Sequence, residues 1–181
     1  KQALSSTARA ISGDFETKNE LEKNKNSKKF DLFDIENLNS KNDFIKARAE
    51  FDTAALKKKF SNEKIYKKNI PSNTSCRSLY SIAEKIRYES LGGKMLRGIE
   101  KNLKENYNLI ISSKRKDQLK TKEDVPIIDA FELYMLKKFH NIKLNSLTDK
   151  MLNFWEKDFD KAIEDNINFL KDNLEYQDKY S

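Results

Sequence analysis

Three charged residues on one stretch of the chain, Glu84, Arg87 and Glu89, have the types and spacing that could do chemistry or bind a partner. On an α-helix Glu84 and Arg87 lie one turn apart, which allows an ion pair, and Leu91 continues the same stripe. Under a structural interpretation, Arg87 pairs with Glu84 and hydrogen-bonds to carbonyls of a neighbouring helix. Under a functional interpretation, the three residues form a contact surface for another subunit. We favour the structural interpretation, because the flanks of a core helix are often half-buried.

Few other residues could hold a metal ion or act as a nucleophile. Cys76 and His140 are the only cysteine and histidine, and they lie far apart in the sequence. Sites for divalent transition metals such as zinc gather several histidine, cysteine or carboxylate groups, and no such spacing occurs here. We expect His140, at the end of a helix, to interact with the helix dipole instead. The sequence therefore predicts no metal-binding and no catalytic residue.

A nucleotide site is not predicted either. Gly93 and Gly98 have the glycine spacing of a P-loop, but Ile99 follows where that motif requires lysine. We therefore expect no bound cofactor in this chain.

The charged residues lie within a longer amphipathic stretch, residues 79–103. Three of the four glycines of the chain lie in it, and Gly92-Gly93 interrupts the apolar pattern as a helix end or hinge would. We expect two helical pieces that meet at a glycine corner. The apolar face of the first piece is predicted to contain Leu79, Ile82, Ala83, Ile86 and Ser90, and that of the second Met95, Leu96, Ile99 and Leu103.

The order of residues in this stretch resembles a helix of the T subunit of the aerobic cobaltochelatase, the CobT family. The pattern is Glu84-x-x-Arg87-x-Glu89-x-Leu91-Gly92-x5-Gly98-x3-Asn102-Leu103. Residues 3–11 resemble the first helix of that family, and Trp155 with residues 170–178 resembles its last helix. We call seven of these positions the signature residues, as candidates for either an interface or a structural role. They are Glu84, Arg87, Glu89, Gly92, Gly98, Asn102 and Trp155.

The resemblance implies a function in cobalamin biosynthesis. In this family a large N subunit holds hydrogenobyrinic acid a,c-diamide and cobalt, an AAA+ S subunit hydrolyses ATP, and the T subunit couples the two. This chain would be a docking and assembly domain of a ligase that forms nitrogen–metal bonds, with cobalt and ATP handled by its partners. A His-His-Asp-like patch of the family reads Phe60-Ser61-Asn62 here, so no ligand role carries over. The acidic linker and the von Willebrand-type domain of the family, with its D-x-S-x-S motif, are expected to lie outside this chain.

Length and composition limit the classes of fold that this chain can adopt. A length of 181 residues suits a single domain, and two prolines and four glycines favour long helices over a many-stranded sheet. We predict a mostly α domain over residues 1–181, with five or six helices and a possible small β-hairpin near residues 14–40. No apolar run is long enough to span a membrane, and one cysteine suits a reducing compartment, so we expect a cytoplasmic protein.

Apolar spacing and capping residues place the other helices. We expect helices over 1–12, from Asn42 or Asp43 to Phe60, and in a short turn beyond Asn62. Thr74 or Ser75 is predicted to cap the central helix, and residues 110–125 to form a surface connection. Another helix is expected from Pro126, and a last continuous helix from Asn145 or Ser146 to about Tyr176. Within that helix Trp155 is the aromatic residue expected to be partly exposed.

Charge leaves an alternative open. The net charge is +7, and residues 41–122 alone carry 21 basic and 9 acidic side chains, a net +12. A basic helical nucleic-acid-binding module is therefore the competing hypothesis, and a helical scaffold unrelated to cobalamin is a third. Lysines outnumber arginines 30 to 6. Because nucleic-acid readers usually depend on arginine and aromatic side chains, we expect nucleic-acid binding to be weak.

Overall fold

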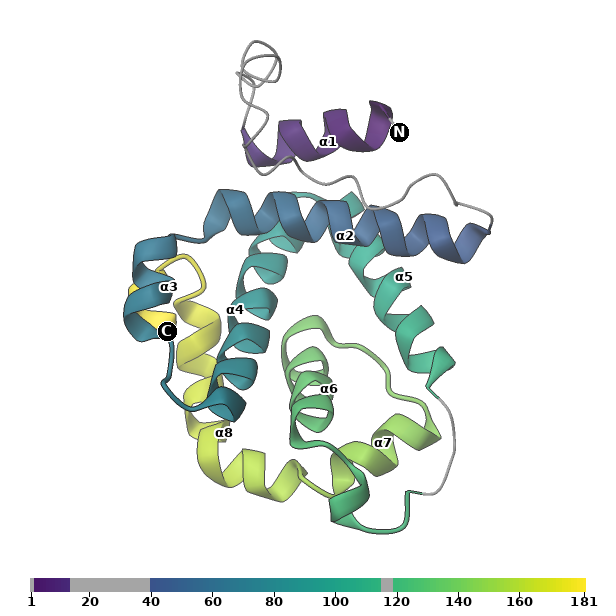
Figure 1. The fold of residues 1–181 in the computed structure, drawn as a ribbon, viewed down its shortest axis with the longest axis vertical. Coiled ribbons are helices and arrows are strands. Elements are labelled where there is room, and N and C mark those ends of the chain that lie inside the picture. The colour runs from purple at the N-terminus through teal and green to yellow at the C-terminus, as the bar shows by residue number, and fades with distance from the viewer. Residues whose placement is uncertain (1, 14–39, 115–118) are drawn as a thin grey trace.

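The computed structural model describes residues 2–13, 40–114 and 119–181, and in these ranges the chain folds into helices and connecting turns (Figure 1). The helices in chain order are α1 (Gln2–Ser12), α2 (Lys41–Phe60), α3 (Glu63–Asn69), α4 (Thr74–Met95), α5 (Arg97–Ser113), the 3-10 helix η3 (Lys122–Asp124), α6 (Ile127–His140), α7 (Ser146–Asn153), α8 (Glu156–Asp172) and α9 (Gln177–Tyr180).

The predicted mostly α fold is confirmed, whereas the predicted number of helices is wrong. Nine α-helices lie in the described residues, where five or six were expected, and these residues contain no strand. The possible hairpin near residues 14–40 lies outside the described residues except for Ser40.

Polar side chains define where several helices begin. Ser40 and Asp43 form a reciprocal capping box at the start of α2, so this helix begins slightly before the predicted Asn42 or Asp43. Asn73, rather than Thr74 or Ser75, caps α4 by accepting hydrogen bonds from two backbone N–H groups. Asn62 caps α3 in the same way.

Helix α4 is the central element. It packs against α2, α5 and α6, while α1 lies along α2 on the outside (Figure 1). Ile86 of α4, Leu56 of α2, Leu103 of α5 and Tyr134 of α6 are at most 2% exposed, so the core lies where these four helices meet. The predicted apolar face of α4 is thus correct at Ile86, but Leu79, Ile82 and Ala83 are only partly buried.

The predicted glycine corner is wrong in position. Helix α4 continues through Gly92 and Gly93 to Met95, and the chain turns at Leu96, whose backbone is extended with φ −142°. Gly92 is required by the neighbouring helix rather than by a bend. The Cβ of an alanine there would lie 2.4 Å from two side-chain carbons of Leu56 on α2.

Two further boundaries differ from the prediction. Helix α5 extends to Ser113, into the stretch expected to be a surface connection, because Ile111 is buried in the core. The predicted continuous last helix is divided into α7, α8 and α9, with breaks at Phe154-Trp155 and at Asn173. The indole N–H of Trp155 donates to the carbonyl of Val125 at 3.1 Å, which holds the first break against the loop before α6.

In the described parts of the chain, no helix combines the length and apolar character needed to cross a membrane.

Candidate functional site

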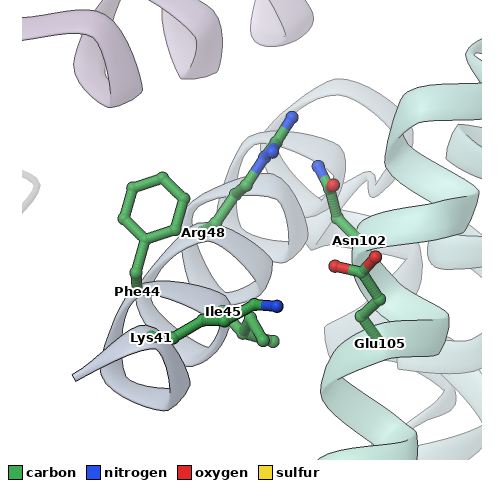
Figure 2. A pocket seen from close by; sticks show the side chains of 6 residues that line it. All are labelled: Lys41, Phe44, Ile45, Arg48, Asn102 and Glu105. Atoms are coloured by element: carbon green, nitrogen blue, oxygen red, sulfur yellow. The ribbon is translucent and has the colours of Figure 1, made fainter.

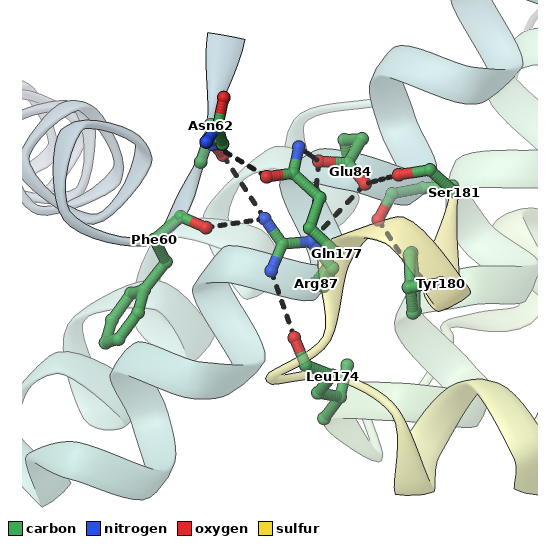
Figure 3. A network of polar contacts seen from close by, with 10 residues as sticks. Phe60, Asn62, Glu84, Arg87, Leu174, Gln177, Tyr180 and Ser181 are labelled. Atoms are coloured by element: carbon green, nitrogen blue, oxygen red, sulfur yellow. Dashed lines mark hydrogen bonds and ion pairs between the residues drawn. The ribbon is translucent and has the colours of Figure 1, made fainter. Parts of the chain in front are cut away.

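Arg87 lies at the centre of a buried polar network beside the core (Figure 3). The ion pair expected from the helical spacing forms, with 3.3 Å between Nε of Arg87 and Oε1 of Glu84. The two terminal nitrogens of the guanidinium group donate to the carbonyls of Phe60, at 2.7 Å, and Leu174, at 3.0 Å. Phe60 is the last residue of α2 and Leu174 follows α8. Arg87 therefore satisfies a carbonyl that the end of α2 leaves without an intrahelical donor, together with the carbonyl of Leu174 in the turn after α8.

Glu84 connects α4 to the C-terminal turn. Its carboxylate accepts hydrogen bonds from Nε2 of Gln177, at 2.8 Å, and from the hydroxyl of Ser181, at 2.9 Å. Gln177 in turn accepts from the backbone N–H of Asn62 at 2.6 Å, which links α9 to the start of α3. The hydroxyl of Tyr180 donates to the carbonyl of Ala83 on α4. The Glu84–Arg87 pair thus joins α4 to the end of α2, to the turn after α8 and to the C-terminal turn (Figure 3).

Glu89 forms a second buried polar contact on α4, facing α2 and α5. Its two carboxylate oxygens accept hydrogen bonds from the hydroxyls of Thr53, at 2.7 Å, and Tyr107, at 2.5 Å. Burial raises the pKa of Glu89, while the charge of Lys85 and the two hydrogen bonds oppose that rise. Glu89 therefore holds three helices together, and its carboxylate is not open to solvent.

Asn102 takes part in a third contact, between α5 and α2. Its side-chain amide donates to Asp52 at 2.7 Å, and both residues are buried. Burial raises the pKa of Asp52, against the hydrogen bond from Asn102 and the charge of Arg48. Glu84, Arg87, Glu89 and Asn102 thus all bind groups of this chain. The first three are only 1–2% exposed, less than the apolar residues Leu79, Ile82 and Ala83 on the same helix.

The remaining signature residues occupy three different environments. Gly92 lies against Leu56, as described above, whereas the space beside Gly98 is open. Trp155 is partly exposed, as predicted, and stacks on Phe159 at the opposite end of α6 from His140. The ammonium group of Lys122 lies 4.2 Å from the centre of the Trp155 ring. The structure therefore gathers Glu84 and Arg87 in one network but places Gly98 and Trp155 apart from it.

A comparison with models of protein families identifies the family of this chain. The family model described as cobalamin biosynthesis protein CobT matches residues 1–181. The chain belongs to the CobT family. Searches of curated proteins and of solved structures gave no match. Membership implies a role in cobalamin biosynthesis, as a cobaltochelatase-related subunit that works in a complex.

One pocket of this CobT chain opens between α2 and α5 (Figure 2). Its volume is about 130 Å³, below the several hundred Å³ of pockets that hold cofactors or drug-sized ligands. The pocket therefore has room for a side chain rather than for a nucleotide. It is lined by Lys41, Phe44, Ile45, Arg48, Asn102 and Glu105.

His140 is buried at the end of α6, beside the ring of Tyr107. Its Nε2 atom has no hydrogen-bond partner among the residues that the structure describes. Burial, together with the charge of Lys104, lowers the pKa of His140 to about 4, so the imidazole is neutral at neutral pH. His140 lies at the C-terminal end of α6, where an interaction with the helix dipole was expected, but a neutral imidazole brings no positive charge to it.

The metal-ligating side chains of this CobT chain are scattered. Cys76 is exposed near the start of α4, remote in sequence from His140. Within residues 2–13, 40–114 and 119–181, no three His, Cys, Asp or Glu side chains form a group that could hold a metal ion.

Sequence reasoning missed the partners of the signature residues. Thr53, Tyr107 and Ser181 were not singled out, and Gln177 was noted only for its resemblance to the last helix of the family, although each bonds to a signature carboxylate. For α2 a local signal existed, because Asp52 and Thr53 interrupt the apolar positions Phe51, Ala54 and Ala55 in the middle of the helix. Buried polar residues need partners, so such an interruption indicates a polar contact.

Proposed function

We propose that this CobT chain is a non-catalytic assembly domain of the ATP-dependent cobaltochelatase. It docks to the AAA+ S subunit and the large N subunit, so that ATP hydrolysis is coupled to insertion of cobalt into hydrogenobyrinic acid a,c-diamide. In this proposal cobalt and ATP are bound by the partner subunits and not by this chain.

The observation that carries the proposal is that the charged signature side chains are buried and bond within their own chain. The carboxylates of Glu84 and Glu89 and the guanidinium group of Arg87 each bond to groups of their own chain, below the surface. Catalytic acids and bases need access to a substrate, and these side chains have none. Their arrangement supports a role in fixing the shape of a domain whose surface then contacts other subunits.

A binding experiment with separate subunits tests the proposal. We expect the immobilised chain to capture the purified S subunit, the purified N subunit, or both, after nuclease treatment and in about 0.3 M salt. At that ionic strength the Debye length is below about 8 Å, so attraction due only to the net charge of +7 is strongly screened.

The control is an unrelated helical protein of similar size and net charge, which should capture neither subunit. Circular dichroism of the immobilised preparation establishes that the chain is folded. If the folded chain captures neither subunit under any salt condition, the proposed function is wrong.

A further inference from the structure

The turn between α4 and α5 presents apolar side chains to solvent. We call residues Lys94–Gly98 the α4–α5 corner, and all five are exposed. Met95 is 39% exposed and Leu96 49%. Among the exposed large apolar side chains of the described residues, these two are the only neighbours in sequence. The chain is buried again on both sides of the corner, at Gly92 and at Ile99.

The corner has a defined backbone shape. The N–H of Leu96 donates to the carbonyl of Gly92 at 2.9 Å, and the carbonyl of Leu96 accepts from the N–H of Ile99 at 3.0 Å. Helices α4 and α5 diverge from this point beside α2 (Figure 1). Because two packed helices hold the corner, Met95 and Leu96 are presented with little further loss of conformational entropy on binding.

Gly98 is not explained by contacts with the residues that the structure describes. Its φ is not in the left-handed region, and a Cβ at this position would meet no atom within 4 Å. Glycine in a helix is less favourable than alanine. At Gly92 the packing of Leu56 accounts for the glycine, but at Gly98 no neighbour in the described parts of the chain does. A bare backbone here leaves room for close approach from outside.

The charges around the corner are positive. Lys94 and Arg97 are exposed on either side of Met95 and Leu96. The nearest carboxylate in the sequence, Glu100, bonds to Lys104 at 2.6 Å, so its charge is largely compensated. None of the described side chains caps the first turn of α5, which adds backbone N–H donors to the same positive surface.

We propose that the α4–α5 corner docks an acidic segment of a partner subunit. An apolar side chain of that segment packs on Met95 and Leu96, and adjacent carboxylates lie beside Lys94 and Arg97. The segment backbone passes over Gly98. This inference rests on the proposed function, because it names the surface through which the chain contacts the S or N subunit.

Titration of labelled chain with each purified subunit tests the corner. Leu96→Ala and Arg97→Glu should each weaken binding by about ten-fold or more, as for central residues of an interface. Gly98→Ala should weaken binding while leaving the melting temperature unchanged or raising it, since alanine is the better helix former. A loss of binding without loss of stability would not be expected of a merely structural glycine.

Two matched controls lie elsewhere on the surface. Phe169 on α8 is 50% exposed, nearly the same as Leu96, and Lys161 on the same helix is exposed. Phe169→Ala and Lys161→Glu should bind like the parent chain.

The outcomes separate this inference from the proposed function. If the parent chain binds a subunit and all three corner variants bind it equally well, the corner is not the docking surface, although the proposed function stands. If the corner variants and the controls weaken binding alike, the effect is not specific and the inference is also wrong. If the parent chain binds neither subunit, both are wrong.

Discussion

At the residue scale, Arg87 is the side chain on which most contacts depend. Arg87→Ala would leave Glu84 without its ion-pair partner, and the carbonyls of Phe60 and Leu174 without their side-chain donor. Breaking a buried ion pair costs about 3–5 kcal/mol, a large share of the 5–15 kcal/mol that stabilises a typical domain. We expect the melting temperature to fall by roughly 3 °C for each kcal/mol lost, measured by circular dichroism.

Arg97 offers a matched control for that prediction. It is exposed at the α4–α5 corner, so Arg97→Ala should leave the melting temperature almost unchanged. The melting temperature of Arg87→Lys should lie between those of the two alanine variants. Lysine keeps the positive charge but lacks the planar guanidinium group that reaches several acceptors at once. If Arg87→Ala and Arg97→Ala melt alike, the buried network contributes little to stability.

His140 should make stability depend on pH in the acid range. The pKa of a histidine in the unfolded chain is about 6.5, and burial lowers it to about 4 in the folded protein. Between these values the unfolded state binds a proton that the folded state does not. Protonation therefore favours unfolding as the pH falls, at a cost of up to about 3 kcal/mol by pH 4.

His140→Leu removes this contribution, since leucine is of similar size and brings no titratable group. Urea unfolding at pH 7, 6, 5 and 4 should show a shallower loss of stability for the variant than for the parent. The carboxylates are the same in both proteins, so the difference reports His140 together with its charge interaction with Glu100. Parallel curves would mean that His140 is not neutral in the fold.

At the scale of elements, Gly92 sets the distance between α4 and α2. A Cβ at this position would lie 2.4 Å from the Cδ atoms of Leu56, which is fully buried. We expect Gly92→Ala to cost about 1–3 kcal/mol, because α4 must shift or Leu56 must leave its preferred rotamer. Denaturant unfolding measures this loss, and Gly98→Ala, with open space around it, should show none.

A second substitution tests the cause. Leu56→Ala alone should cost about 2–5 kcal/mol through loss of buried contacts and a cavity. In the double variant the alanine at position 92 has room, so the two losses should not add. Additive losses would show that the strain at Gly92 comes from another contact.

The helices themselves were largely predictable from the sequence, because apolar spacing and capping residues report local structure. Their interruptions were not. The apolar stripe continues through Phe154 and Trp155, so nothing in its period revealed that α7 ends there. Gly92-Gly93 suggested a bend, because a glycine that permits close helix packing has the same appearance in a sequence as one that permits a turn.

Of the contacts in the candidate site, only those that start from residues of α4 were predictable. The spacing of Glu84 and Arg87 predicted their ion pair, and a carbonyl acceptor for Arg87 was expected. The partners Gln177 and Ser181 come from more than 90 positions further along the chain. Local periodicity carries no information on which distant segment folds back onto a helix, so this half of the network required the structure.

At the scale of the whole molecule, the C-terminal turn ties the domain together. Gln177, Tyr180 and Ser181 all bond to α4, and Gln177 also bonds to the backbone before α3. Removing residues 177–181 would leave the buried carboxylate of Glu84 with Arg87 as its remaining described partner. An undersatisfied buried charge costs several kcal/mol, so we expect this truncation to destabilise the entire helical domain.

The fluorescence of Trp155 shows whether that loss is global. Trp155 contacts Val125 and Phe159 and makes no described bond to the C-terminal turn. If the domain unfolds as one cooperative unit, truncation should lower the urea midpoint reported by Trp155 as much as the midpoint reported by circular dichroism. Tyr180→Phe, which deletes only the hydrogen bond to Ala83, is the matched control and should cost about 1 kcal/mol. A Trp155 transition unchanged by truncation would instead mean that α6 to α8 fold independently of the network around Arg87.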